Sequence, residues 1–493
     1  MNSIKKLAGQ TAVYGVSSIL GRLLNYLLVP LHTRIFIPTE YGVVGEMYAY
    51  VSLLYVILMF GMETAFFRFA EKENDLHKVY STTLTSIFAV CVLFIVVMLS
   101  FSGPIANLLH YPQHPEYIVW FALVIALDAF SSIPFALLRQ QNKAKRFATI
   151  KMLNIGMNVG LNVFFLLLCP WLLKNNILTS IVSFIYHPSI GVGYIFIANL
   201  IASLFTIVLL LPDIVSFSLK FDYTLFRKMF TYAFPLLIFG LAGIVNETFD
   251  RIMIKYLSPQ EIASAQVGIY SACYKISIMI TIFIQAFKYA AEPFFFSQAK
   301  FADAQKTYAE VMKYFVIACS FMFLGITLMM ELVKFFVGKE YYEGLKIVPI
   351  LLLANIFLGI FYNLSVWYKL TDKTSYGAYI SIGGALLTLI LNFILIPLIG
   401  YLGAAWTTFI CYLSMMVVSF IIGQKHYPIP YNVVKLVSFI LLSVIFYFFS
   451  LWYAQFLPHI ALKLILNGLL LIVYAAIIWF VEKRNLHQLI HSK

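Results

Sequence analysis

Apolar runs of about 20 residues recur along the whole chain, separated by short polar segments. A helix of that length spans about 30 Å, the thickness of the hydrocarbon core of a bilayer. Backbone groups in hydrocarbon must be satisfied within the segment itself, so each run is expected to be a helix. The sequence therefore predicts an all-α polytopic membrane protein. The fourteen predicted transmembrane helices cover residues 11–31, 43–61, 81–101, 117–138, 152–172, 193–211, 234–254, 268–290, 315–330, 347–367, 379–399, 402–422, 433–453 and 461–480.

The distribution of basic residues predicts the orientation of these helices. With the N-terminus inside, 24 of the 34 Lys and Arg residues lie in cytoplasmic segments or at the helix ends next to them, 7 lie in this way on the opposite side, and three (Arg22, Arg251 and Lys275) lie deeper within helices. Because basic loops stay in the cytoplasm, we expect both termini to be cytoplasmic. The same asymmetry accounts for the net charge of +13, so we expect no nucleic-acid binding.

Weak internal repeats divide the chain into two halves. Three short patterns of Pro, Gly, Glu and Asn recur in the same order, which favours six-helix halves at residues 1–231 and 232–430. Residues 431–493 then add two transmembrane helices and a short cytoplasmic tail. The paired patterns are 34–40 with 255–261, 161–163 with 391–393, and 188–193 with 397–403.

The first helix of each half carries an arginine at membrane depth, Arg22 in one and Arg251 in the other. Halves with an even number of helices have the same orientation, and transporters built in this way bind substrate near the midplane between the halves. A charge buried in hydrocarbon costs several kcal/mol, so these arginines should face a paired or hydrated interior.

Further polar residues follow the same helices. Asn25 shares a helical face with Arg22, Glu247 and Asp250 lie beside Arg251, and Lys275 and Asp128 lie in two other predicted helices. One interpretation is that such residues only hold helices together, with Glu247 and Arg251 as a satisfied i, i+4 pair. We favour a hydrated, cation-bearing cavity that binds an anionic substrate, because arginine presents phosphate with a planar fork of donors. The predicted substrate-binding residues are Arg22, Asn25, Arg251 and Lys275.

Enzymatic chemistry has little support in the sequence. The chain has no phosphate-binding Gly-x-x-x-x-Gly-Lys-Ser/Thr loop, no His-Glu-x-x-His helix and no Cys/His cluster, so we predict no catalytic residue, metal or cofactor. Energy would then come from a proton or Na⁺ gradient, or from substrate supply. Glu247, Asp250 and Asp128 are the acids placed to bind a coupling H⁺ or Na⁺, and we expect Glu247 or Asp250 to exchange the ion for contact with Arg251 as the halves move. The alternative is that Glu247 and Asp250 only neutralise Arg251.

The opening segment, Tyr14 to Gly42, resembles the first helix and loop of bacterial polysaccharide (O-antigen type) flippases. Its loop reads Arg34-Ile-Phe-Ile-Pro-Thr-Glu-Tyr-Gly42, and two later stretches, Leu138-Arg-Gln-Gln-Asn-Lys143 and Val267-Gly-Ile-Tyr270, also fit. These flippases belong to the multidrug/oligosaccharidyl-lipid/polysaccharide exporter superfamily. The resemblance covers the first twelve helices. It implies a V-shaped pair of six-helix bundles that rocks between inward- and outward-open states around a basic cavity, to which Arg22, Arg251 and Lys275 map.

This resemblance implies that the chain flips an undecaprenyl-diphosphate-linked oligosaccharide across the bacterial inner membrane for polysaccharide or lipopolysaccharide export. We expect a monomer whose partners are this lipid and the membrane, with a polymerase and glycosyltransferases as candidate contacts. Three alternatives stay open: a peptidoglycan-precursor flippase, a cation-coupled drug antiporter of the same superfamily, and an O-antigen polymerase or ligase. The last class resembles chains with a long basic periplasmic loop, whereas the outward loops here are short.

Overall fold

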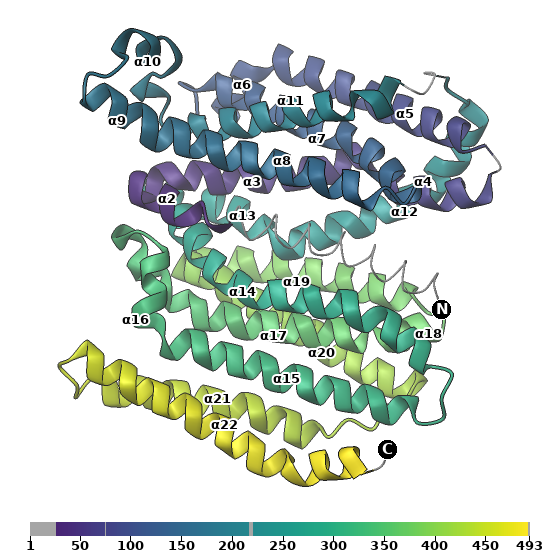
Figure 1. Cartoon of the computed structure of the whole chain (residues 1–493), viewed down its shortest axis with the longest axis vertical. Coiled ribbons are helices and arrows are strands. Elements are labelled where there is room, and N and C mark those ends of the chain that lie inside the picture. The colour runs from purple at the N-terminus through teal and green to yellow at the C-terminus, as the bar shows by residue number, and fades with distance from the viewer. Residues whose placement is uncertain (1–25, 74, 216–219, 492–493) are drawn as a thin grey trace. The chain divides into compact units, whose positions relative to one another are not determined.

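The computed structural model describes residues 26–73, 75–215 and 220–491, and within these ranges all regular structure is helical (Figure 1). Thirteen described helical segments are long and apolar enough to cross a membrane, and each coincides with a predicted span from 43–61 onward. The all-α polytopic prediction is therefore confirmed. The remaining predicted span, 11–31, lies mostly outside the described residues.

The spanning segments often extend beyond the apolar runs. Several continue past a short break, so that α3 (Pro38–Met59) and α4 (Met62–Lys72) form one segment, and α8 (Ala144–Val163) continues through η1 (Phe164–Leu168) into α9 (Cys169–Lys174). Shorter helices are α2 (Val29–Ile35), α6 (Ser102–Leu108), α10 (Thr179–Ile185), α13 (Phe249–Leu257) and α16 (Met330–Val333). The other spanning helices are α5 (Leu76–Ser100), α7 (Pro115–Gln140), α11 (Gly193–Val215), α12 (Tyr223–Glu247), α14 (Gln260–Gln298), α15 (Ala304–Leu328), α17 (Val348–Leu364) with α18 (Val366–Leu370), α19 (Ser375–Ile399), α20 (Tyr401–His426), α21 (Val433–Ala454) and α22 (Ile460–His491).

The helices pack into two compact units, Met1–Gly268 and Ile269–Lys493. Packing therefore divides the chain within α14, whereas the sequence repeat divides it between residues 231 and 232. The difference arises because α12 packs against α3, α4 and α5, and α13 packs against α3, all within the first unit. The repeat-based halves stay a prediction, since a repeat describes internal similarity and a compact unit describes contacts.

The core of the first unit lies where α4, α5, α7 and α12 meet. Met62, Phe66 and Tyr80 are fully buried there, and the Phe66 and Tyr80 rings stack edge to face at 6.2 Å. Gly61 makes this packing possible, because it adopts φ +77° between α3 and α4. A Cβ on Gly61 would also lie 2.6 Å from the backbone oxygen of Ala233 in α12. Glycine alone tolerates both conditions.

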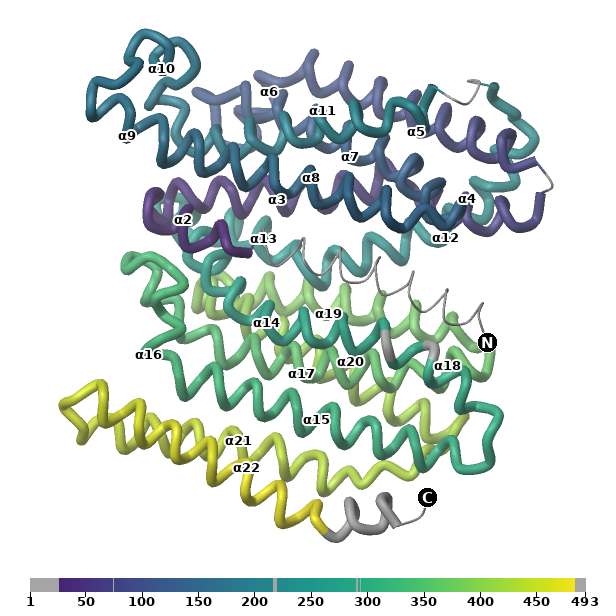
Figure 2. Tube along the Cα trace, viewed as in Figure 1, coloured from purple at the N-terminus to yellow at the C-terminus, as the bar shows by residue number. Residues whose placement is uncertain are grey.

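In the second unit, α20 packs against α17 and α19, and α15 packs against α17 and α21 (Figure 2). The last two helices are held by the buried carboxylate of Glu482 in α22. Its oxygens pair with Lys313 of α15 at 2.9 Å and with Lys435 of α21. A buried acid flanked by two bases keeps its charge compensated, so ion pairs as well as apolar contacts join the two C-terminal helices to the rest of the second unit.

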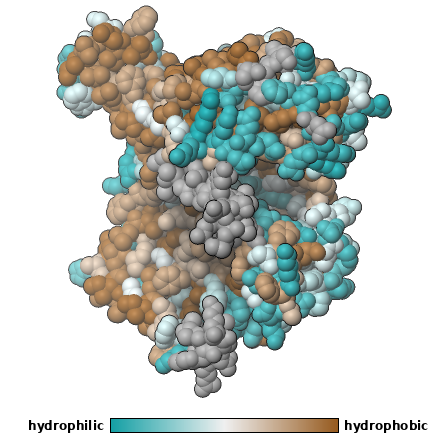
Figure 3. All heavy atoms as spheres, turned by 45° about the vertical axis from the view of Figure 1, so that its right-hand side comes forward, coloured by the Kyte–Doolittle hydropathy of each residue, from teal (hydrophilic) through white to brown (hydrophobic). Residues whose placement is uncertain are grey.

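Each unit exposes broad apolar areas, shown in brown in Figure 3. On α21, Phe448 is 62% exposed and Ile445 is 60% exposed, and Phe393 on α19 is 61% exposed. Contiguous apolar surface of this extent is unfavourable in water, whereas lipid chains cover it without cost. The surface therefore agrees with a multi-pass membrane protein.

Candidate functional site

The predicted helix 234–254 is broken in the middle of its charged segment. The helix α12 ends at Glu247, Thr248 leaves the helical conformation with φ −134° and ψ −15°, and α13 begins at Phe249. Thr248 closes the end of α12, because its backbone N–H and its hydroxyl both donate to the Ile244 carbonyl at 2.9 and 3.2 Å. Broken helices at membrane depth present unpaired backbone ends, and such ends commonly line binding sites.

Arg251 lies in the first turn after this break and is 8% exposed. Its Nη1 donates to Asp250 Oδ1 at 2.9 Å and to the backbone carbonyl of Glu247 at 3.2 Å. The Arg251 backbone N–H also donates to Asp250 Oδ1, at 2.8 Å. Asp250 suits the first turn of α13, because the amino end of a helix stabilises a negative charge.

Because of the helix break, Glu247 contacts Arg251 through its backbone and not through its side chain. Its side chain is exposed at the last position of α12, and Glu247 contacts Arg251 through its carbonyl oxygen. Asp250 supplies the carboxylate of the Arg251 ion pair. A buried and charged Arg251–Asp250 pair is therefore held directly at a helix break.

The other predicted substrate-binding residues are placed less completely. Lys275 is half-buried on α14 in the second unit. Arg22 and Asn25 lie outside the described residues. The structure thus brings together Arg251, Asp250 and the Glu247 carbonyl, and a shared site with Arg22, Asn25 and Lys275 stays a prediction.

Asp128 of α7 lies in a separate polar cavity of about 410 Å³ inside the first unit. Its Oδ1 accepts a hydrogen bond from Ser203 Oγ of α11 at 2.7 Å. A cavity of this size has room for several water molecules, and its polar walls supply partners for them. The residues lining this N-unit cavity are Tyr55, Glu63, Asp128, Ser131, Ser132, Phe135, Arg139, Phe147, Lys151, Asn154, Asn199, Ser203 and Thr206.

Two acids and two bases meet in the N-unit cavity. Arg139 pairs with Glu63, and the Lys151 ammonium lies 4.1 Å from the centre of the Phe135 ring, close to Asp128. Sequence reasoning assigned the Glu63, Arg139 and Lys151 charges to cytoplasmic loops. They line the cavity because α4, α7 and α8 continue beyond the apolar runs.

The sequence did contain a signal for one wall of this cavity. Asn199, Ser203 and Thr206 of α11 follow one another at spacings of four and three, and so share a helical face. Asn154 of α8 joins this face by donating to Thr206 Oγ1 at 2.8 Å. A polar stripe on a helix as apolar as α11 could have been identified from its periodicity.

A second buried charge pair was also missed. Glu46 of α3 is fully buried, accepts a hydrogen bond from the Tyr111 hydroxyl, and lies 3.8 Å from the Lys255 ammonium of α13. Lys255 also donates to Ser264 Oγ of α14 at 2.6 Å. Sequence reasoning placed Lys255 in an outward loop. Its burial shows that this end of the first unit is a packed polar network.

A comparison with models of protein families identifies the family of this chain. A family model described as "Polysaccharide biosynthesis protein" matches residues 7–299, more than half of the chain. The chain belongs to this family. The resemblance seen in the first helix and loop is thereby confirmed. No curated protein matches this polysaccharide biosynthesis family member in a sequence search.

Solved structures show which fold this family member shares. The lipid II flippase MurJ in an inward closed conformation is 13% identical, with a TM-score of 0.68, covering 95% of this chain and 99% of MurJ. An inward-facing multidrug resistance MATE family transporter of the MOP superfamily is also 13% identical, with a TM-score of 0.64 and coverages of 82% and 94%. A MATE protein in the straight conformation is 12% identical, with a TM-score of 0.59 and coverages of 85% and 95%. The fold is that of MOP-superfamily flippases and transporters, and at this identity the likeness concerns the fold alone.

Proposed function

We propose that the protein flips an undecaprenyl-diphosphate-linked oligosaccharide from the cytoplasmic to the outer leaflet of the bacterial inner membrane by alternating access. The family match supports a role in polysaccharide biosynthesis. The single observation that carries the proposal is Arg251, a buried guanidinium at the break between the spanning helix α12 and the short helix α13. We infer that it binds the diphosphate.

The physical problem of flipping this substrate is its charge. An isolated ion in hydrocarbon costs on the order of tens of kcal/mol by Born estimates, so a diphosphate needs cations at membrane depth. Arginine suits this role because its planar fork binds two phosphate oxygens at once. Arg22, Asn25 and Lys275 are the further residues that we propose for this binding, from their positions in the sequence.

Arg251 also stabilises Asp250, so an export test must separate binding from folding. Arg251→Ala should abolish export but also leaves a buried carboxylate without its partner, and Arg251→Lys should restore export only in part. The decisive variant is Arg251→Gln combined with Asp250→Asn, which removes both charges with little change in shape. We expect it to accumulate normally and still fail to export.

The measurement is the appearance of lipid-linked oligosaccharide on the outer membrane leaflet in cells, normalised to the amount of inserted protein. Arg227→Gln is the matched control, because Arg227 is an exposed arginine on the same helix as Glu247. Wild-type export by the double variant would show that Arg251 is only structural. Running the assay with the peptidoglycan precursor, which also carries a diphosphate, separates the two flippase alternatives.

We further propose that a proton or Na⁺ gives the transport its direction. A second ligand shifts a conformational equilibrium only by its different affinity for the two states. Among the predicted coupling acids, Asp250 is engaged by Arg251 and Glu247 is exposed, whereas Asp128 lines a polar cavity. This arrangement favours Asp128 over Glu247 and Asp250, the two acids that the sequence-based hypothesis favoured.

Proteoliposomes with an imposed proton or Na⁺ gradient test the coupling. Wild-type flipping should rise with one of the two gradients, and Asp128→Asn should keep basal flipping while losing that increase. Glu247→Gln and Asp250→Asn are the comparison variants. Wild-type flipping that is indifferent to both gradients would mean that substrate supply alone drives the protein.

A further inference from the structure

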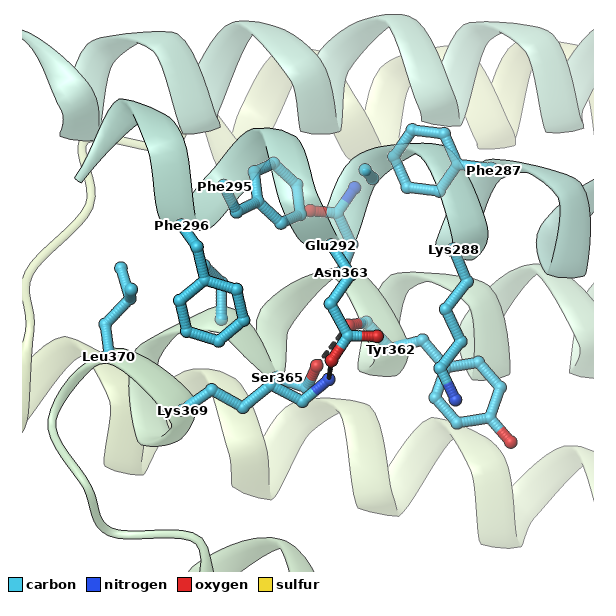
Figure 4. A pocket seen from close by; sticks show the side chains of 12 residues that line it. Phe287, Lys288, Glu292, Phe295, Phe296, Tyr362, Asn363, Ser365, Lys369 and Leu370 are labelled. Atoms are coloured by element: carbon cyan, nitrogen blue, oxygen red, sulfur yellow. Dashed lines mark hydrogen bonds and ion pairs between the residues drawn. The ribbon is translucent and has the colours of Figure 1, made fainter. Parts of the chain in front are cut away.

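A small pocket lies in the second unit where α14 meets the end of α17 and α18 (Figure 4). Its polar residues are Lys288 and Glu292 from α14, Asn363 from α17 and Lys369 from α18. Phenylalanine side chains of α14 and Tyr362 form much of the remaining wall. None of these residues belongs to the predicted substrate or coupling sets.

Asn363 is the first indication of a ligand. The residue is 2% exposed, and in the described part of the chain neither its Nδ2 nor its Oδ1 has a hydrogen-bond partner. Native proteins satisfy nearly all buried polar groups, with protein atoms, ordered water or a ligand. Figure 4 shows the amide among the pocket residues. A polar group from outside the chain is therefore expected beside it.

The charged residues around the pocket indicate whether the polar group beside Asn363 is positive or negative. Glu292 Oε1 is neutralised by Lys369 Nζ at 2.6 Å. Lys288 lies with its ammonium 4.8 Å from the centre of the Tyr362 ring, and among residues 26–73, 75–215 and 220–491 no carboxylate forms an ion pair with it. The pocket thus carries one positive charge in excess, which favours an anion.

The size of the pocket and the residues around it indicate which class of anion it binds. The free volume of the pocket is about 20 Å³, enough for one water-sized group such as a single phosphate oxygen. Beside it, Phe296 is 46% exposed and Tyr289 is 52% exposed on the apolar surface of α14. Tyrosine favours the boundary between lipid tails and headgroups, because its ring is apolar and its hydroxyl is polar. A phosphate carried by a lipid reaches such a place more readily than a phosphate free in water.

We propose that this pocket binds the phosphate of a membrane-lipid headgroup. One phosphate oxygen accepts from Asn363 Nδ2, Lys288 provides the balancing charge, and a headgroup hydroxyl or a water donates to Asn363 Oδ1. Two lipids carry this chemistry, an anionic phospholipid and the polyprenyl diphosphate of the proposed substrate. The proposal concerns binding and does not depend on the export activity.

The test measures lipid binding to the delipidated full-length protein in detergent by native mass spectrometry. The probes are phosphatidylglycerol, undecaprenyl diphosphate and, as a lipid without phosphate, diacylglycerol. We expect at least one phosphate lipid to bind with an affinity at least tenfold above that of diacylglycerol. A hydrogen bond to a charged group contributes about 1.5–3 kcal/mol, so Lys288→Gln and Asn363→Leu should each weaken that binding about tenfold or more.

The controls separate the two lipids and guard against misfolding. Lys373→Gln is the matched control, since Lys373 is exposed on the connection after α18 and does not line the pocket. Loss of phosphatidylglycerol binding alone assigns the site to a phospholipid, and loss of undecaprenyl diphosphate binding alone assigns it to the substrate. Unchanged affinity for both lipids in Lys288→Gln and Asn363→Leu would overturn the proposal and leave the pocket to water. Asn363→Leu removes the unpartnered amide at similar volume, so it should fold.

Discussion

Gly42 and Gly268 form a helix crossing that tolerates no side chain. Gly42 lies in the first turns of α3 and Gly268 in the first turns of α14, both within the first unit. A Cβ on Gly42 would lie 1.9 Å from the Ser264 carbonyl oxygen, and a Cβ on Gly268 would lie 1.9 Å from the Pro38 carbonyl oxygen. Small residues allow such close backbone approach between membrane helices.

The cost of Gly42→Ala follows from this geometry. The contact would have to lengthen from 1.9 Å to at least 3.0 Å, so the two backbones would have to separate by at least 1.1 Å. Overpacking commonly costs about 1–3 kcal/mol, and a clash with backbone is at the upper end because no side chain can rotate away. The unfolding entropy of a chain of this size is about 1 kcal/mol/K, so we expect the melting temperature to fall by about 3 °C.

The assay is thermal unfolding of the purified protein in detergent, followed by loss of the monodisperse peak in size-exclusion chromatography. Gly160→Ala is the control, because a Cβ there meets nothing within 4 Å. It should leave stability unchanged or raise it by up to about 1 kcal/mol, since alanine is the better helix former. A melting temperature for Gly42→Ala equal to that of Gly160→Ala would refute the close crossing.

Two further predictions concern orientation and buried charge. A topology reporter at Gln113 should read outside and one at Lys145 inside, and a cytoplasmic signal at Gln113 would contradict the orientation. Lys255→Met should destabilise the protein by about 3–5 kcal/mol, because it leaves Glu46 buried without its cation. Adding Glu46→Gln to Lys255→Met should recover most of the loss in the same thermal assay, and no recovery would mean that the pair does not act as one unit.

Hydropathy alone located the membrane-spanning segments. All thirteen spans in the described residues coincide with predicted runs, because the transfer of about 20 apolar residues into hydrocarbon depends on local composition. The same local reasoning identified Arg251 and Asp250, since a charge inside an apolar run is anomalous whatever surrounds it. The family resemblance also came from a contiguous segment.

Packing decided what those charged residues contact. The segment around Thr248 has no Pro or Gly, so its sequence gives no reason to break the helix, and the break appears where α13 packs against α3. Because of that break, Arg251 pairs with Asp250 and not with Glu247, which was its i, i+4 partner in the alternative interpretation of the sequence.

The other buried polar contacts were also decided by packing and not by the local sequence. Asp128 and Ser203 are 75 residues apart in the chain, and Glu46 and Lys255 lie on helices from different halves of the sequence repeat. The sequence determined which segments enter the membrane, because that free energy is a sum over neighbouring residues. The tertiary structure determined which polar groups pair there, because in hydrocarbon each must find its partner on whichever helix packs beside it.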